Sequence, residues 1–462
     1  MAKIKSFSYV LCHLVLVLVN IYIFRKMYYY DNEKLSWSQR AAQEAEKVAS
    51  ISCSGHGRAY IDGYVNVDGN PICECYSCYG GIDCSLFSSN CSANVEGGDP
   101  LFLEPFWMQN AASSAVVVAG WHRMSYVFPN NLSFISKELE KSIRKIHAIA
   151  KNAITHGKYI IFGTGSTQLL HAAVHALSMD NKNSTKVVAN KIPYYSLYKL
   201  QTEYFQTRNC EFGGDSSMLK NNSDFAGNVI EFVTSPNNPD GNLESPVLNG
   251  PNVKHIYDHA YYWSHYTAIP APADEDLMIF SMSKLTGHAG SRFGWAIVKD
   301  VNVYTRMMEF ISLAEMGTSK DVQLRALTLL KVVAQGDDKQ LFNFAQQILT
   351  DRWKKLSHIF SLTKRFSLQT IPTQYCIFFE RTREPSPGYA WVKCKRKEDK
   401  NCQEIFRVAK ITGRTGRQFF AGDRYVRFSL LRGQHDFDML IHRLKELIYQ
   451  EYEANAQAMS SF

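Results

Sequence analysis

Residues 281–294, Ser-Met-Ser-Lys-Leu-Thr-Gly-His-Ala-Gly-Ser-Arg-Phe-Gly, place a lysine where folded proteins rarely tolerate one. They follow an apolar run, residues 277–280, which predicts a short buried strand. Lys284 therefore comes directly after a buried strand and among small residues. A desolvated ammonium is costly unless it is paired or neutralised. We expect Lys284 to have a chemical role.

Two interpretations fit this segment on its own. The first is a basic loop at the edge of a sheet. The second is a lysine that holds an aldehyde cofactor, for which burial of the amine is useful. Pyridoxal phosphate is the cofactor that requires such a lysine, together with a phosphate site and a partner for its ring nitrogen.

The length and charge of the chain narrow its class. At 462 residues the chain is too long for one simple core, so we expect two or more folded units. The net charge is +8, but Lys and Arg are interspersed with Asp and Glu, and the basic clusters at 393–397 and 414–417 are short. This pattern is typical of a solvated surface, so no nucleic-acid partner is expected.

The N-terminus has the pattern of a signal anchor. Lys3 and Lys5 precede a largely apolar run over residues 9–24, which Arg25 and Lys26 follow. Because no small-residue cleavage site ends the run, an uncleaved anchor is favoured over a removed signal peptide. We predict an anchor over residues 1–30, with its helix at about 8–24, and a helical stem over residues 31–50. The protein is then a single-pass membrane protein.

A dense cysteine block follows over residues 51–98. Six of the eleven cysteines lie there: Cys53, Cys73, Cys75, Cys78, Cys84 and Cys91. A region this small buries little core, so three disulfides are expected, with zinc as the alternative interpretation. The six cysteines permit fifteen pairings, and the sequence does not choose among them. Residues 75–84 resemble the C-terminal half of an EGF-like module.

Possible glycosylation sites agree with a secreted topology. They are Asn131, Asn183 and Asn221, with Asn90 weaker because a cysteine follows it. Together with the disulfides they predict that everything after the anchor lies on the lumenal or extracellular side of the secretory pathway.

From residue 99 the chain alternates helical and strand-like segments. Strand-like runs at 159–162, 186–189, 229–233, 255–257 and 278–280 indicate an α/β large domain, residues 99–305, with a largely parallel sheet. Long helices at 305–317, 321–335 and 338–361, then strands at 377–379 and 425–429, indicate a smaller C-terminal domain over residues 306–462. In such sheets ligands bind at the carboxyl ends of the strands.

Residues suited to one cofactor follow these runs. Ser166 and Thr167 open a helix after a strand and can bind phosphate with Ser281 and Arg292. Asp258 closes an apolar run, and a protonated ring nitrogen is a partner for it. Asn238 and Tyr261 can share the phenolic oxygen. The simpler interpretations are a helix cap for Ser166 and Thr167, and a turn around Asn238.

Arg427 lies within the apolar pattern of residues 425–429. A semi-buried arginine is the natural bidentate clamp for the α-carboxylate of an amino-acid substrate. A structural ion pair is the competing interpretation for this residue alone. No cluster with metal-ligand spacing is needed for this chemistry, and no metal is expected.

The order of these residues resembles that of PLP-dependent transferases of fold type I. Residues 121–126, 163–169, 235–241, 258–263 and 286–295 are similar to signatures of the alliinase family, which includes plant alliin lyases and tryptophan aminotransferase-related proteins. The resemblance extends from about Cys53 to the C-terminus. It implies a homodimer in which Tyr126 approaches the cofactor phosphate across the interface, and a disulfide between Cys394 and Cys402.

The resemblance leaves two reactions open. One is transfer of the amino group of tryptophan or another L-amino acid to a 2-oxo acid such as pyruvate, which we favour. The other is carbon–sulfur lysis of S-alkyl cysteine sulfoxides. Both use Lys284 as base, so the motifs do not decide. A third hypothesis, a membrane-anchored binding protein with a dead enzyme domain, is disfavoured because every required residue is present.

Overall fold

A computed structural model provides the structure of the chain. It describes residues 13–26, 35–129, 132–179, 184–220, 227–335 and 340–460. The chain forms two compact units, one of residues 1–88 and 117–122 and the other of residues 89–116 and 123–462. The predicted boundary at 305/306 lies inside the second unit and stays a prediction. Asn131, Asn183 and Asn221 lie outside the described residues.

The first unit contains the stem and the disulfide-rich module. The predicted stem is a helix, α2 (Trp37–Ala49), which begins with a capping box between Ser36 and Gln39. Disulfides join Cys53 to Cys73 and Cys75 to Cys84, as expected for a module with little core. Two short hairpins complete it: β1 (Gly57–Arg58) with β2 (Glu74–Cys75), and β3 (Tyr79–Gly80) with β4 (Leu86–Phe87).

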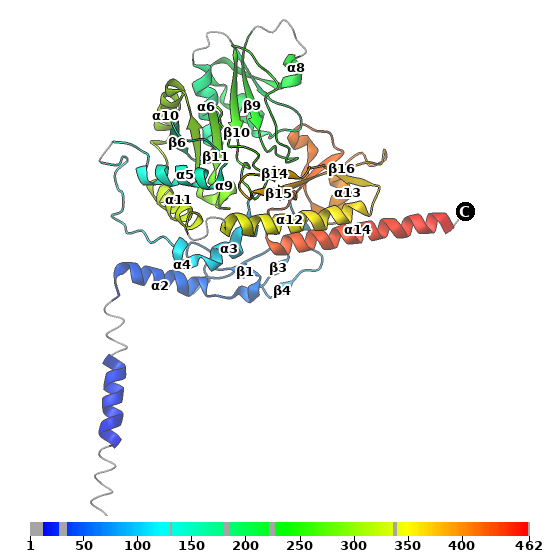
Figure 1. Ribbon diagram of the computed structural model, residues 1–462. Helices are drawn as coiled ribbons and strands as arrows, with labels where there is room; N and C mark the ends of the chain where they lie inside the picture. The colour runs from blue at the N-terminus through cyan, green and yellow to red at the C-terminus, as the bar shows by residue number, and fades with distance from the viewer. Residues whose placement is uncertain are drawn as a thin grey trace, which may run out of the picture. The chain divides into compact units, whose positions relative to one another are not determined.

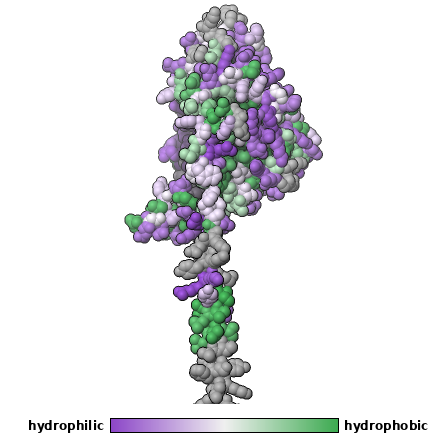
Figure 2. Space-filling model, turned by 90° about the vertical axis from the view of Figure 1, so that its left-hand side faces the viewer, coloured by the Kyte–Doolittle hydropathy of each residue, from purple (hydrophilic) through white to green (hydrophobic). Residues whose placement is uncertain are grey.

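The predicted membrane helix is not supported. Its first part lies outside the described residues, and residues 13–26 form a helix with exposed apolar side chains (Figure 2). Among the residues that the structure describes, no helix has both the length and the hydropathy needed to cross a bilayer.

The second unit is built on a seven-stranded sheet, in the order β6-β12-β11-β10-β9-β7-β8 (Figure 1). All its strands run parallel except β12, which is antiparallel to both β11 and β6. The predicted largely parallel sheet is confirmed, and β8 and β12 are the two strands that the sequence pattern did not reveal. The bounds are β6 (Tyr159–Gly163), β7 (Thr185–Ala189), β8 (Cys210–Asp215), β9 (Asn228–Thr234), β10 (Val253–Asp258), β11 (Leu277–Ser281) and β12 (Gly294–Val298).

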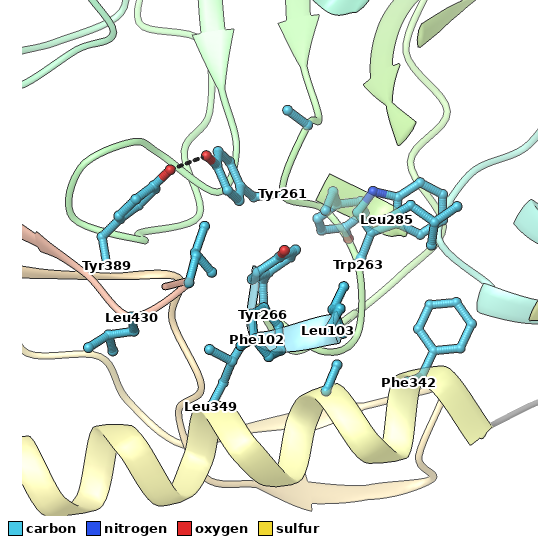
Figure 3. Packing of buried hydrophobic residues seen from close by; sticks show 14 of the residues in the cluster. Phe102, Leu103, Tyr261, Trp263, Tyr266, Leu285, Phe342, Leu349, Tyr389 and Leu430 are labelled. Carbon is cyan, nitrogen blue, oxygen red and sulfur yellow. Dashed lines mark hydrogen bonds between the residues drawn. The ribbon is translucent and has the colours of Figure 1, made fainter. Parts of the chain in front are cut away.

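Helices cover both faces of this sheet because its strands are apolar on both sides. On one face Ile161, Ile279 and Ala296 pack against α6 (Gly165–Ser178), α7 (Leu197–Phe205) and α10 (Val301–Glu315). On the other face Phe162, Phe280 and Trp295 belong to the larger core, which includes α5 (Lys137–Ala150), α11 (Lys320–Val333) and α12 (Gln340–Ser361). Figure 3 shows part of that core, with Phe342 and Leu349 reaching from α12.

The C-terminal part adds a four-stranded sheet, in the order β13-β16-β19-β18, and the long helix α14. The predicted strand at 425–429 is confirmed as β19, but that at 377–379 is wrong. The residues on either side of this run form the strands instead: β14 pairs with β15, and residues 377–380 are the turn between them. The disulfide between Cys394 and Cys402 is present. The strands are β13 (Phe366–Leu368), β14 (Gln374–Cys376), β15 (Arg381–Arg383), β16 (Tyr389–Cys394), β18 (Arg414–Thr415) and β19 (Tyr425–Ser429).

Shorter elements complete the unit. A parallel pair joins β5 (Ala93–Asn94) to β17 (Ile411–Thr412). The remaining helices are α3 (Glu104–Gln109), α4 (Ala111–Ser114), α8 (Ser216–Lys220), α9 (Met282–Leu285), α13 (Cys402–Val408) and α14 (Gln434–Ser460). Single 3₁₀ turns lie in this unit at Leu101–Leu103, Thr207–Asn209, Ala289–Ser291 and Gly416–Phe419, and in the first unit at Cys53–Gly55.

A buried histidine makes the stability of this core depend on pH. His147 lies 2.8 Å from Asn152 Oδ1 through Nδ1, and its Nε2 accepts a hydrogen bond from the Trp295 indole at 2.8 Å. Burial lowers the pKa of His147 to about 4. The ring is therefore neutral near pH 7, as the acceptor role of Nε2 requires. In the unfolded chain this histidine binds a proton near pH 6.5. The contribution of neutral His147 to the free energy of unfolding is therefore fully present above that pH and is lost as the pH falls toward 4.

We therefore expect His147 to remove about 2 kcal/mol of stability between pH 7.5 and pH 5. The measurement is urea unfolding followed by tryptophan fluorescence at both pH values. A His147→Gln variant, which cannot titrate, should show a correspondingly smaller difference between the two pH values than the wild type. An equal difference in the two proteins would contradict this account.

Candidate active site

Six of the ten predicted functional residues line one cavity of about 330 Å³, at the carboxyl edge of the large sheet: Ser166, Asn238, Asp258, Tyr261, Lys284 and, from β19, Arg427. A larger hollow, of about 690 Å³, lies between α12 and α14 and contains none of them. Within the described ranges no group of three or more His, Cys, Asp or Glu side chains could hold a metal ion. The smaller cavity is lined by Gly98, Asp99, Ser166, Tyr195, Thr234, Asn238, Asp258, Ala260, Tyr261, Lys284, Ala289, Tyr389, Arg414 and Arg427.

Lys284 reaches this cavity from α9, the single helical turn after β11. Ser281 caps that turn by accepting a hydrogen bond from the Ser283 amide at 3.2 Å. The Lys284 Nζ donates to the Gly98 carbonyl and lies 5.4 Å from the ring centroid of Tyr261. Burial lowers the pKa of Lys284. A larger share of neutral amine follows, as a nucleophile or base requires.

Asp258 ends β10 and is 5% exposed. Its carboxylate accepts hydrogen bonds from the Tyr198 hydroxyl at 2.9 Å and from the Ala260 amide at 3.1 Å. Burial nevertheless raises its pKa. A cationic partner in the cavity would offset that cost, as the predicted role of Asp258 requires.

An anion cradle lies where β6 ends and α6 begins. Gly165 there has a φ of +72°, and a Cβ on it would lie 2.4 Å from an Arg292 guanidinium nitrogen. The same guanidinium donates to Thr167 Oγ1 at 3.4 Å. Backbone amides at the start of α6 and the Arg292 charge thus converge beside Ser166, which suits a phosphate group.

We expect Gly165→Ala to weaken cofactor binding by about tenfold or more. The new methyl group must displace the Arg292 guanidinium, and alanine is strained at the positive φ of this position. The dissociation constant for pyridoxal phosphate, from absorbance titration, is the measurement. Gly290→Ala is the matched control, since a Cβ there meets nothing within 4 Å. Equal affinities in the two variants would contradict the assignment of the cradle.

Arg427 and Asn238 form a hydrogen-bonded pair in the cavity wall. Arg427 is 1% exposed and donates to Asn238 Oδ1 at 2.9 Å and to the Glu96 carbonyl at 2.7 Å. Its buried Nε has no hydrogen-bond partner among the described residues. The Oδ1 of Asn238 accepts the bond from Arg427, so the group that Asn238 can offer to a ligand in the cavity is its amide nitrogen, as a donor.

Tyr261 and Tyr389 share a hydroxyl–hydroxyl hydrogen bond of 2.5 Å across the cavity (Figure 3). The Arg427 guanidinium lies 3.9 Å from the ring centroid of Tyr389. Burial by itself would raise the pKa of Tyr389, but the Lys284 and Arg427 cations and the bond with Tyr261 hold it below its usual value. The sharing of a phenolic oxygen by Tyr261 and Asn238 stays a prediction.

Tyr126 is not part of this cavity. Its side chain is 71% exposed, and it is not among the lining residues. Thr167, Ser281 and Arg292 do not line the cavity either: Thr167 and Arg292 lie at the cradle, and Ser281 caps the helical turn that carries Lys284. A role for Tyr126 across a dimer interface stays a prediction.

Sequence reasoning missed several lining residues. Tyr195 lines the cavity and Tyr198 donates a hydrogen bond to Asp258; both follow β7, so the rule about strand ends could have identified them. Gly98, Tyr389 and Arg414 come from distant segments, and no local pattern marks them.

Comparisons with known proteins agree with this geometry. Residues 93–448 match the family described as allinase, and residues 36–91 match the alliinase EGF-like domain. The chain is 54% identical over 418 residues to tryptophan aminotransferase-related protein 3 of Arabidopsis thaliana, covering 90% of this chain and 92% of that protein. It is 47% identical over 428 residues to an alliin lyase of Allium cepa var. aggregatum, with coverage of 90% and 92%.

Solved structures show the same fold. A multiple substrate aminotransferase from Thermococcus profundus aligns with a TM-score of 0.58 at 15% identity, covering 79% of this chain and 93% of that one. The aspartate aminotransferase of Rhizobium meliloti aligns with a TM-score of 0.57 at 17% identity, covering 78% and 91%. At these identities the likeness concerns the fold alone.

Proposed function

Since the chain belongs to the alliinase family, with the fold of PLP-dependent aminotransferases, we propose that it transfers the amino group of an L-amino acid to a 2-oxo acid. The preferred donor is tryptophan or another aromatic amino acid, and pyruvate is a suitable acceptor. The observation that carries the proposal is that Lys284, Asp258 and Arg427 line a single cavity.

The cavity residues fit pyridoxal phosphate. Ser166, Thr167 and Arg292, with Ser281 at the end of β11, would hold the phosphate in the cradle at Gly165. The buried Asp258 would face the ring nitrogen, and Lys284 would hold the aldehyde carbon. When bound, the cofactor supplies an aldehyde that takes up the substrate amine and a protonated ring that accepts the electrons of the Cα bond.

The chain's own residues would then orient the substrate and move one proton. Arg427 would hold the α-carboxylate through the N–H groups that Asn238 and Glu96 leave available. The neutral amine of Lys284 would take the proton from Cα. Lys284 would then deliver that proton to the carbon that the cofactor aldehyde contributes, and not back to Cα, which leads to transamination.

Carbon–sulfur lysis is the second candidate. It is favoured by the identity to an alliin lyase, 47% over 92% of that protein's length. Both reactions use the same proton transfer by Lys284 and differ in whether a β-sulfoxide group leaves. We place transamination first because two tryptophan aminotransferase-related proteins, at 54% and 51% identity, are more similar to this chain.

Product analysis with the purified, cofactor-loaded protein separates the two reactions. One reaction receives tryptophan and pyruvate, and the other receives an S-alkyl cysteine sulfoxide. Alanine with indolepyruvate supports transamination, and pyruvate with a sulfenic acid supports lysis. No product in either reaction would contradict both.

We also propose that the enzyme is a homodimer on the lumenal or extracellular side of the secretory pathway. The disulfides Cys53–Cys73, Cys75–Cys84 and Cys394–Cys402 support an oxidising compartment. Gel filtration with light scattering tests the dimer. Resistance of the full chain to protease in intact microsomes, lost on adding detergent, tests the location.

A further inference from the structure

The tyrosine that begins β16 lines the cavity but has no part in the proposed chemistry. We propose that Tyr389 is a positioning residue that acts through Tyr261, fixing the Tyr261 hydroxyl so that it donates a hydrogen bond to the phenolic oxygen of the cofactor. The inference rests on the proposed function, because it needs the cofactor in this cavity, and on the predicted contact of Tyr261 with the phenolic oxygen.

The C-terminal sheet holds Tyr389 in a fixed position. Tyr389 lies two residues before Trp391, which is the cross-strand partner of Arg427 in the pair of β16 and β19. Side chains two residues apart share one face of a strand, so Tyr389 and Arg427 project from the same face. The Arg427 guanidinium packs against the buried Tyr389 ring, 3.9 Å from its centroid. The Tyr389 hydroxyl therefore enters the cavity from a rigid support.

The Tyr389 hydroxyl lies beside the amine that would hold the cofactor. A Cβ on Gly98 would lie 2.7 Å from the Tyr389 hydroxyl oxygen and 3.5 Å from Lys284 Nζ, so both atoms approach the same glycine. The Tyr261 ring is also close, with its centroid 5.4 Å from Lys284 Nζ. In pyridoxal phosphate the phenolic oxygen is on the ring carbon next to the one that carries the aldehyde. Hydroxyl groups beside Lys284 are therefore the ones suited to contact that oxygen.

The two tyrosines share one hydrogen bond, and its direction decides which proton remains for a ligand. Their hydroxyl oxygens lie 2.5 Å apart and point toward each other (Figure 3). Each hydroxyl has one proton to donate and can also accept. Burial raises the pKa of Tyr261. Burial acts on Tyr389 as well, but the Lys284 and Arg427 cations outweigh it and hold the pKa of Tyr389 below its usual value. Tyr389 is thus the more acidic phenol and donates, and Tyr261 keeps its own proton for the cofactor.

The bond from Tyr389 also makes Tyr261 a better donor, because a hydroxyl that accepts one hydrogen bond is polarised and donates the next more strongly. A hydrogen bond to the phenolic oxygen stabilises negative charge there. That oxygen shares a proton with the neighbouring nitrogen, which joins Lys284 to the cofactor. Stabilising the negative charge therefore lowers the pKa of this nitrogen, and loss of Tyr389 should raise it.

The test is a pH titration of the visible absorbance of the lysine-bound cofactor in the purified full chain, which reports this pKa without turnover. Tyr389→Phe should raise the pKa by about 0.5, and Tyr261→Phe by about 1 or more. The double variant should match Tyr261→Phe alone, since Tyr389 acts through Tyr261. Tyr262→Phe is the matched control and should leave the pKa unchanged. Its buried hydroxyl donates to the Ala271 carbonyl at 2.7 Å and does not line the cavity.

A second variant keeps the tyrosine in case Tyr389→Phe does not fold. Gly98→Ala would place a methyl group 2.7 Å from the Tyr389 hydroxyl and displace it, so the pKa should again rise. An unchanged pKa in Tyr389→Phe, or in Gly98→Ala if only that variant folds, would overturn the inference. A rise in the double variant equal to the sum of the two single rises would do the same. Wild-type protein without lysine-bound absorbance would overturn the proposed function as well, so the two failures are distinguishable.

Discussion

Replacing Lys284 with alanine is expected to lower kcat by about 10³-fold or more, whichever of the two reactions the enzyme performs. The reason is that Lys284 is the lysine among the lining residues, and burial lowers the pKa of its amine. The variant should also lose the visible absorbance of lysine-bound cofactor, which steady-state kinetics and a spectrum measure together.

The matched control is Lys299→Ala. Lys299 is exposed and paired with Asp276 at 3.4 Å, away from the cavity. It should keep wild-type kcat and absorbance. An active Lys284→Ala variant with an unchanged spectrum would mean that another group holds the cofactor, and would favour the interpretation of this domain as a binding module.

Asp258→Asn is expected to lower kcat by about 10²–10⁴-fold, the range for breaking a buried ion pair by removing one partner. Asparagine keeps the shape and the contacts with Tyr198 and Ala260, but it carries no charge to hold a protonated ring nitrogen. Steady-state kinetics measures this loss. Asp276→Asn, at an exposed carboxylate, is the control.

Asp258→Asn, which should lower kcat, is not expected to lower the stability of the cofactor-free protein. Burial raises the pKa of Asp258, so the folded state holds this proton more tightly than the unfolded chain does. Its stabilising effect is present at low pH and is lost as the pH rises through the raised pKa. Without cofactor, Asp258→Asn should therefore melt no lower than the wild type at pH 7.5, and added cofactor should stabilise it less. A variant that melts lower without cofactor would indicate a structural role.

Much of the site was predictable because its residues follow buried strands. Lys284 and Asp258 come directly after apolar runs, and the carboxyl ends of parallel strands meet at one edge. The cradle at Gly165 was predictable for the same reason. Local sequence thus determines the part of the site that the large sheet positions.

The residues contributed by the C-terminal sheet could not be predicted in this way. Tyr389 begins β16 and Arg414 begins β18, and they reach the cavity only because these strands pair on either side of β19. Non-local pairing leaves no mark in the adjacent residues. The error at 377–379 has a similar cause, since an apolar run can form a turn when its neighbours supply the strand pairing.

The most direct measurement is to locate the cofactor covalently. The purified full chain is incubated with pyridoxal phosphate, reduced with borohydride, digested and analysed by mass spectrometry. The account predicts that the added mass lies on the peptide containing Lys284, and that Lys284→Ala shows none. Modification mainly at another lysine, or none on the wild-type protein, would contradict it.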